Sequence, residues 1–311
     1  MSGLAPLVVI LGSTASGKSA LGIELAKRLN GEILVCDSTQ IYRHFDIGTG
    51  KTPHAEQQGI PHHLVDMLEP TEIFTAGEYR RRALEVLADL RKRGKLPIIT
   101  AGTGLYLRAL LEGLADTPGR SETIRERLRS IAQHRGAAHL HRLLGRLDPE
   151  SAARIAPQDN QKIIRAIEMR LIGGKPVGEL HRSGRTPLEG YRPLKIGLLP
   201  PRAALYDRIH SRIDAMIAAG WIEEVTSLAQ RGIPANAKPF QFIGYSEWRA
   251  YLAGTLTKLE ATQKIQQATR RFAKRQLTWF RREMNVRWLP RFGDAPEISS
   301  AALEILNSQI S

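Results

Sequence analysis

The residues with the most specific chemistry in this 311-residue sequence form a glycine-bounded loop near the N-terminus. Residues 12–19 read G-S-T-A-S-G-K-S, after an apolar β-branched run and before a helix-like segment, which is the setting of a phosphate-binding P-loop. Gly12 and Gly17 let backbone N–H groups turn toward an anion. Lys18 supplies a mobile cation, and the Ser19 hydroxyl can hold Mg²⁺. The sequence thus predicts a site for a di- or triphosphate, with Mg²⁺ at Ser19, formed by Gly12, Ser13, Thr14, Ala15, Ser16, Gly17, Lys18 and Ser19.

Two further apolar runs also end in polar side chains. Residues 32–36 lead into Asp37, and residues 96–101 lead into the turn that carries Thr103. Because ligands of parallel sheets bind outside the carboxyl ends of the strands, we expect Asp37 and Thr103 to lie in one crevice with Lys18. Asp37 could there bind Mg²⁺ or act as a general base, and Thr103 could hold a bridging oxygen or a base.

Strands and helices alternate at the spacing of an α/β protein. They predict a P-loop NTPase-like core, a parallel sheet flanked by helices. The stretch 116–189 is instead basic and helical in period, which indicates a helical insertion domain that binds nucleic acid, and a strand at 194–199 resumes the core. We therefore expect a catalytic core of residues 1–115 and 190–290, with 291–311 as a C-terminal tail.

A long basic helix is predicted from Ile265 to Met284. Its period divides the residues into two faces. The expected buried face holds Ile265, Ala268, Phe272 and Trp279, and the expected exposed stripe holds Arg271, Arg275 and Arg282.

The net charge of +14 is unevenly placed along the chain. Residues 1–119 are neutral, whereas 120–189 carry a net charge of +6 and 264–287 carry +7. Such segregation favours a nucleic-acid partner over a merely solvated helix face. The single cysteine excludes an internal disulfide and fits the cytoplasm, and no apolar run has the length of a membrane span.

Five blocks together resemble the tRNA dimethylallyltransferase (tRNA isopentenyltransferase) family. Residues 37–42, D-S-T-Q-I-Y, are similar to its D-S-x-Q-x-Y block, and residues 102–106, G-T-G-L-Y, to its G-G-T-x-L-Y block. The remaining family-like blocks are 159–166, 243–247 and 269–280, in the family's order.

This resemblance implies that the five-carbon group of dimethylallyl diphosphate moves to the N6 amine of the adenosine 3′ of a tRNA anticodon. The P-loop would hold the diphosphate, and Arg212, rather than Arg208 one turn earlier, would stabilise it as it leaves. Asp37 would take the amine proton, and Lys18 and Thr103 would complete the catalytic set. The implied partners are a tRNA anticodon stem-loop and dimethylallyl diphosphate, with no membrane and a monomeric enzyme.

The implied tRNA contacts are spread from residue 37 to residue 282. Gln241 stands where family enzymes often have a basic residue. The contacts are Asp37, Ser38, Thr39, Gln40, Thr103, Arg125, Gln161, Lys162, Ile163, Ile164, Arg165, Gln241, Phe242, Ile243, Gly244, Tyr245, Ser246, Arg271, Lys274, Arg275 and Arg282.

Two other functions remain open from the residues. A P-loop kinase of small molecules would use Asp37 for Mg²⁺ or a hydroxyl substrate, but leaves the two basic stretches without a role. A non-catalytic RNA-binding ATPase would account for the charge, but leaves Asp37 and Thr103 without a task.

Overall fold

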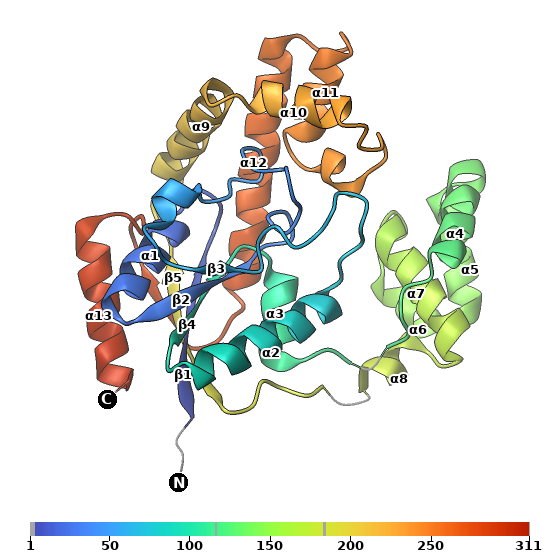
Figure 1. The fold of residues 1–311 in the computed structure, drawn as a ribbon. Helices are drawn as coiled ribbons and strands as arrows, with labels where there is room; N and C mark the ends of the chain where they lie inside the picture. The colour runs from blue at the N-terminus through green and yellow to red at the C-terminus, as the bar shows by residue number, and fades with distance from the viewer. Residues whose placement is uncertain (1–3, 116, 183–184, 311) are drawn as a thin grey trace. The chain divides into compact units, whose positions relative to one another are not determined.

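The computed structural model describes residues 4–115, 117–182 and 185–310 (Figure 1). The chain divides into two compact units, a core unit of Met1–Leu110 and Glu189–Ser311 and a helical unit of Leu111–Leu188. Residue 116, where the predicted insertion begins, lies outside the described residues.

The core unit is built on a six-stranded sheet in which every pair of neighbours is parallel. Its order is β3-β2-β4-β1-β5-β6, and the predicted α/β fold with a parallel sheet is confirmed. The central strands are continuous apolar runs because helices cover both faces of the sheet. The strands are β1 (Ala5–Gly12), β2 (Gly31–Cys36), β3 (His62–His63), β4 (Leu96–Ala101), β5 (Tyr191–Leu198) and β6 (Val286–Leu289).

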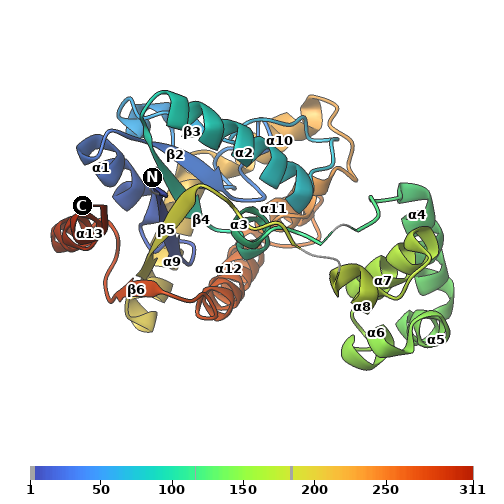
Figure 2. The ribbon, with the colours of Figure 1, turned by 90° about the horizontal axis from the view of Figure 1, so that it is seen from below.

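Helices of the core unit lie on both sides of this sheet. Figure 2 shows α1 and α13 on one side and α2, α3 and α12 on the other. The helices are α1 (Lys18–Arg28), α2 (Ala76–Lys92), α3 (Gly104–Glu112), α9 (Arg202–Ala218), α10 (Trp221–Gln230), α11 (Tyr245–Leu252), α12 (Lys258–Phe280) and α13 (Pro296–Ile310), with short 3₁₀ turns at η1 (His54–Gln57) and η2 (Lys238–Gln241).

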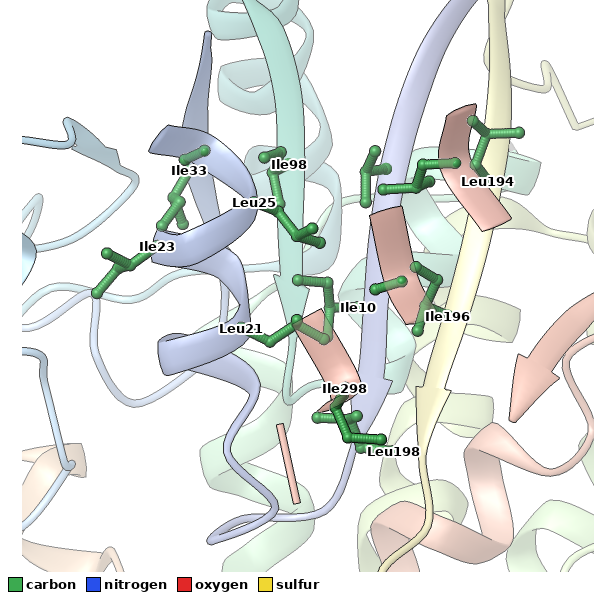
Figure 3. Close-up of a cluster of buried hydrophobic side chains, with 14 of the residues drawn as sticks. Ile10, Leu21, Ile23, Leu25, Ile33, Ile98, Leu194, Ile196, Leu198 and Ile298 are labelled. Carbon is green, nitrogen blue, oxygen red and sulfur yellow. The ribbon is translucent and has the colours of Figure 1, made fainter. Parts of the chain in front are cut away.

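The C-terminal residues are part of the hydrophobic core. Ile298 and two further residues of α13, Ala302 and Leu306, are buried in one cluster with α1 and the sheet, as Figure 3 shows for Ile298 beside Leu198. The prediction of a tail at 291–311 is therefore wrong. The four-residue spacing of these apolar side chains forms one helical face, which the core covers.

The long basic helix differs from its prediction in both length and phase. α12 begins after the N-cap Thr257 and ends at Phe280, so Arg282 lies beyond the helix and does not share its stripe. Trp279, expected on the buried face, is 37 % exposed and packs against the backbone of Gly104. The buried positions are Ala261, Ile265, Ala273, Gln276 and Phe280.

The helical unit has a core of its own. Leu128, Leu140, Leu144 and Ile163 are buried together there. Its helices are α4 (Glu122–Arg135), α5 (Ala137–Leu147), α6 (Pro149–Arg154), α7 (Asn160–Gly173) and α8 (Val177–Arg182). Across the described parts of both units, no helix has the length and apolar character needed to cross a membrane.

Candidate active site

A cleft of about 1120 Å³ opens at the carboxyl ends of β1, β2 and β4 in the core unit. Its lining includes the P-loop from Thr14 to Ser19, and Asp37 at the end of β2. Arg212 enters from α9, and Gln276 from α12. Parallel topology thus brings residues that are distant in sequence to one site, as expected for an open α/β sheet.

The P-loop presents a cation that is only partly compensated. Gly17 has a φ of 88°, the left-handed region that favours glycine, and α1 begins directly after it. The Lys18 ammonium donates to the carbonyl oxygen of Ser13 at 2.7 Å. Burial lowers the pKa of Lys18 to about 8; the Asp37 carboxylate opposes this shift, and the Arg212 guanidinium adds to it. A bound anion would supply the missing compensation.

Asp37 is held in one orientation beside this cation. Its Oδ1 accepts hydrogen bonds from the backbone N–H and the hydroxyl of Thr39, at 2.8 and 2.7 Å. On the other side, a Cβ on residue 102 would come within 2.5 Å of Oδ2, so Gly102 is needed for the close approach. The carboxylate therefore has one oxygen engaged by Thr39 and the other beside the end of β4.

Thr103 ties the ends of β2 and β4 together. Its hydroxyl accepts the N–H of Ser38 at 3.0 Å and donates to the Ser38 hydroxyl at 3.2 Å. Its own N–H donates to the carbonyl of Cys36 at 2.9 Å. Thr103 and Ser38 stand behind the lining of the cleft, which Asp37, like Thr39 and Gln40, does reach.

The two candidate arginines of α9 have different partners. Arg212 lies in the cleft, where burial and the nearby Arg208 lower its pKa against the opposing effect of Asp37. Its Nη2 is 3.5 Å from the carbonyl oxygen of Gly50, which also accepts from the Gln40 amide at 3.4 Å. Arg208 instead forms a bidentate ion pair with Asp294, at 2.7 and 2.9 Å.

Glu224 of α10 holds the loop at residues 46–48, which reaches the lining of the cleft at Gly48. This role could not be predicted from the sequence. The Glu224 carboxylate accepts the N–H groups of Asp46 and Ile47, at 3.0 and 2.7 Å, and of Gly48 at 3.4 Å. It also accepts the Tyr245 hydroxyl at 2.6 Å. An acidic residue in an amphipathic helix carries no local signal of such a contact.

Gln276 is a second residue that the sequence did not reveal. Its side chain is 6 % exposed, and its Oε1 accepts the N–H of Thr14 in the P-loop at 2.8 Å. Its Nε2 donates to the carbonyl of Gly102 at 2.7 Å. One buried amide thus connects α12, the P-loop and the strand end beside Asp37. The helix also contains Gln263, Gln266 and Gln267, so nothing in the sequence distinguishes Gln276 from them.

The predicted tRNA contacts of the core unit fall into two groups. Arg271, Lys274 and Arg275 are exposed on α12, and Arg282 is exposed after it. Gln241, Phe242 and Ile243 line the cleft. The side chain of Tyr245 is fully buried against Glu224, and Gly244 is buried against Trp221, while Ser246 remains exposed. The Tyr245 side chain is therefore unavailable to RNA.

In the helical unit, much of the predicted contact set is internal. Arg125 and Arg165 both form ion pairs with the fully buried Glu168, at 2.8 and 2.6 Å. Ile163 and Ile164 are buried, so their side chains are not available to RNA. Gln161 is exposed, and so is Lys162, whose ammonium lies 2.6 Å from Asp159.

A P-loop and an aligned acid at the edge of a parallel sheet define an α/β enzyme core that binds a phosphorylated substrate. Within that class, residues 40–283 match the model of the IPP transferase family, and the chain belongs to this family.

Named relatives agree over nearly the whole chain. A tRNA dimethylallyltransferase of Koribacter versatilis (strain Ellin345) is 51% identical over 302 residues, covering 97% of this chain and 98% of that protein. One of Solibacter usitatus (strain Ellin6076) is 49% identical, with 96% and 97% covered.

Solved structures give the same fold. The tRNA isopentenylpyrophosphate transferase of Bacillus halodurans is 37% identical, with a TM-score of 0.70 and 97% of each chain covered. A eukaryotic dimethylallyltransferase acting on tRNA shares the fold at 24% identity, with a TM-score of 0.79 over 98% of this chain and 78% of that one.

Proposed function

We propose that this chain transfers the dimethylallyl group of dimethylallyl diphosphate to the N6 amine of the adenosine 3′-adjacent to the anticodon in tRNA. The observation that carries the proposal is the single cleft shared by Lys18, Asp37 and Arg212, in a chain whose relatives are named for this transfer. The reaction needs two components side by side, a site that binds the diphosphate and a general base that accepts the proton of the adenine amine.

The phosphate half of the cleft stabilises the leaving group. As the allylic C–O bond breaks, its electron pair leaves with the diphosphate. Lys18, N–H groups of the P-loop and Arg212 would stabilise that growing negative charge. Both cations have pKa values lowered mainly by burial, and the attraction of a bound anion would offset that effect.

Asp37 serves the acceptor half. The adenine amine is a poor nucleophile, because its lone pair is drawn into the ring. As its nitrogen forms the new C–N bond, a proton passes to the Asp37 carboxylate. Thr39 fixes Oδ1, and Thr103 fixes the strand end from which Asp37 projects. A base that enters this cleft has first to leave its stack in the anticodon loop.

Mg²⁺ fits the residues as a partner of the bound diphosphate. Ser19 is exposed and lines the cleft, and no cluster of three or more potential metal-ligating side chains occurs among the described residues. Mg²⁺ commonly keeps several waters and binds substrate phosphates with few protein ligands. Ser19 would hold the ion, which would supply charge stabilisation for the departing diphosphate.

The exposed cations of α12 are the proposed main contacts to RNA phosphates. Arg271, Lys274 and Arg275 all lie outside the buried face of that helix, and such contacts give affinity without reading sequence. Gln241 and Phe242 line the cleft, where polar and stacking contacts to unpaired bases give selectivity. We place the enzyme in the cytoplasm, with its tRNA, and expect it to act as a monomer.

A turnover assay tests the proposal. The purified chain receives labelled dimethylallyl diphosphate or labelled ATP, each with and without tRNA. We expect label in tRNA only with dimethylallyl diphosphate. Phosphoryl transfer from ATP to a small molecule would support a kinase instead, and ATP hydrolysis stimulated by tRNA without prenyl transfer would support an RNA-binding ATPase.

A further inference from the structure

The segment between β6 and α13 packs against the outer side of the P-loop. The N–H of Gly293 donates to the carbonyl of Ser16 at 2.9 Å. A Cβ on residue 17 would lie 2.6 Å from the nitrogen of Gly293 and 2.9 Å from Oδ1 of Asp294. Gly17 therefore has to be glycine because this segment fills the space beside it, as well as for its backbone conformation.

Asp294 is also the partner of Arg208. Two N–H groups of the guanidinium bind the two carboxylate oxygens, at 2.7 and 2.9 Å. The guanidinium carbon lies 4.6 Å from the centre of the Phe292 ring. A bidentate pair and a ring contact restrain the guanidinium more than either would alone.

Arg208 nevertheless keeps an open side toward the cleft. It lines the same cleft as the P-loop, and its side chain is 37 % exposed. A guanidinium has more N–H donors than one carboxylate can engage. The ion pair with Asp294 therefore leaves donors for an anion bound at the P-loop.

We propose that Asp294 is a positioning residue for the donor: it holds Arg208 at the rim of the cleft, where the remaining N–H groups of Arg208 bind the diphosphate. The inference rests on the proposed function for the identity of the donor. It assigns a role to a segment beyond the residues 40–283 that match the family. It also makes the C-terminal segment a part of the donor site.

The test uses inorganic diphosphate, titrated calorimetrically into the full chain, so it does not depend on prenyl transfer. Arg208→Gln removes the proposed contact and should weaken binding about tenfold or more, the usual effect of losing a charged hydrogen bond. Asp294→Asn keeps the shape but breaks the ion pair, and should weaken binding about three- to fivefold, as for a partly exposed pair.

The double variant distinguishes positioning from a general structural role. If Asp294 acts through Arg208, then Asp294→Asn adds nothing in the Arg208→Gln background. The KM for dimethylallyl diphosphate should rise in both single variants while the KM for tRNA stays unchanged. Asp294→Glu, which keeps the charge, should restore part of the affinity.

Glu297→Gln is the matched control, because Glu297, in the first turn of α13, forms an exposed ion pair with Arg291 of the same segment. It should bind diphosphate like the wild type. Unchanged diphosphate affinity in Asp294→Asn, or additive losses in the double variant, would overturn the inference. A wild-type chain that binds diphosphate but transfers no prenyl group would instead contradict the proposed function.

Discussion

The cations of the helical unit and those of the cleft are the same residue types in opposite electrostatic surroundings. Arg125 and Arg165 both bind Glu168, and hydrogen bonding to Glu168 raises the pKa of Arg125. In the cleft, burial lowers the pKa of both Lys18 and Arg212. The positive charges of Arg125 and Arg165 are compensated within the fold by Glu168. Those of Lys18 and Arg212 are compensated less, and we propose that an anionic substrate completes the compensation.

This difference shows why net charge alone does not locate a binding site. The helical unit accounts for much of the excess positive charge in the sequence, yet two of its arginines are compensated by one buried carboxylate. α12 is different again, because its Arg271, Lys274 and Arg275 are exposed. Charge identifies a region, but the partners of each side chain decide what that charge does.

Among the changes that test this comparison of the two groups of cations, removing the cleft cation should have the largest effect. Lys18→Ala should lower kcat/KM for dimethylallyl diphosphate by about 10²–10³, the usual loss for a group that stabilises transition-state charge. The melting temperature should not fall, since the folded chain no longer buries that ammonium. Steady-state kinetics and thermal unfolding measure both. Lys27→Ala, which changes an exposed lysine of the same helix, is the control and should behave as wild type.

Removing the Glu168 carboxylate from the helical unit should lower stability and leave donor binding unchanged, the reverse of the effect of Lys18→Ala. Glu168→Gln leaves Arg125 and Arg165 without their shared charge and should destabilise that unit by about 3 kcal/mol or more. Donor affinity should be unchanged. Hydrogen exchange in α4 and α7 measures the local loss, and protection equal to wild type would show that the pairs contribute nothing.

The stability that Glu168 contributes should also depend on pH. Although burial opposes it, hydrogen bonding from Arg125 and Arg165 lowers the pKa of Glu168 from 4.5 to about 2. A carboxyl group with a lowered folded-state pKa stabilises the fold above its unfolded value, and this stabilisation is lost as pH falls from 4.5 toward 2. Glu168→Gln should remove that part of the acid dependence.

Neutralising α12 should weaken RNA binding far more than donor binding, because Arg271 and Lys274 lie outside the lining of the cleft and only Arg275 of the three reaches it. Replacing Arg271, Lys274 and Arg275 together with glutamine should reduce the slope of log affinity against log salt by about 2, if each contacts one phosphate of unpaired RNA. Filter binding of tRNA across a salt series measures it. Lys92→Gln, an exposed cation of α2, is the control. A wild-type slope in the triple variant would show that these three side chains are solvent-exposed without contacting RNA phosphates.

The smallest effect should come from pH alone. As pH rises from about 7 to 9, Lys18 loses its proton near its pKa of about 8, so donor binding should weaken by up to about tenfold. Affinity falls with rising pH because neutral Lys18 no longer attracts the negatively charged diphosphate. Titration of dimethylallyl diphosphate at several pH values measures it. Lys18→Ala should show a flatter profile, and a flat wild-type profile would contradict the assignment.

The sheet and the P-loop could be predicted because their signals are local. Apolar β-branched runs mark the strands, and the glycine–lysine spacing marks the loop. Asp37 could be placed near Lys18 because parallel strands end at one edge. Gln276 could not be placed, since its contact to Thr14 joins residues 262 positions apart and depends on the phase of a packed helix.

The errors have the same origin. Trp279 and Gln276 differ by three positions in α12, and a small rotation of the helix decides which of them is buried. α13 was predicted as a tail because its apolar face is short, and the sequence alone does not show that α1 and the sheet cover it. Asp294 gave no signal at all, because it lies in a turn and its partner Arg208 is 86 positions earlier, in α9.

The most direct test of the mechanism is the single-turnover rate of prenyl transfer in Asp37→Asn, measured beside its affinity for dimethylallyl diphosphate. Asparagine keeps an oxygen for Thr39 but cannot accept the amine proton. We expect the rate to fall by about 10²–10⁴, the range for a positioned general base, with donor affinity nearly unchanged. A wild-type transfer rate in this variant would contradict the role of Asp37, and a loss confined to donor affinity would make it a ligand of the phosphate site instead.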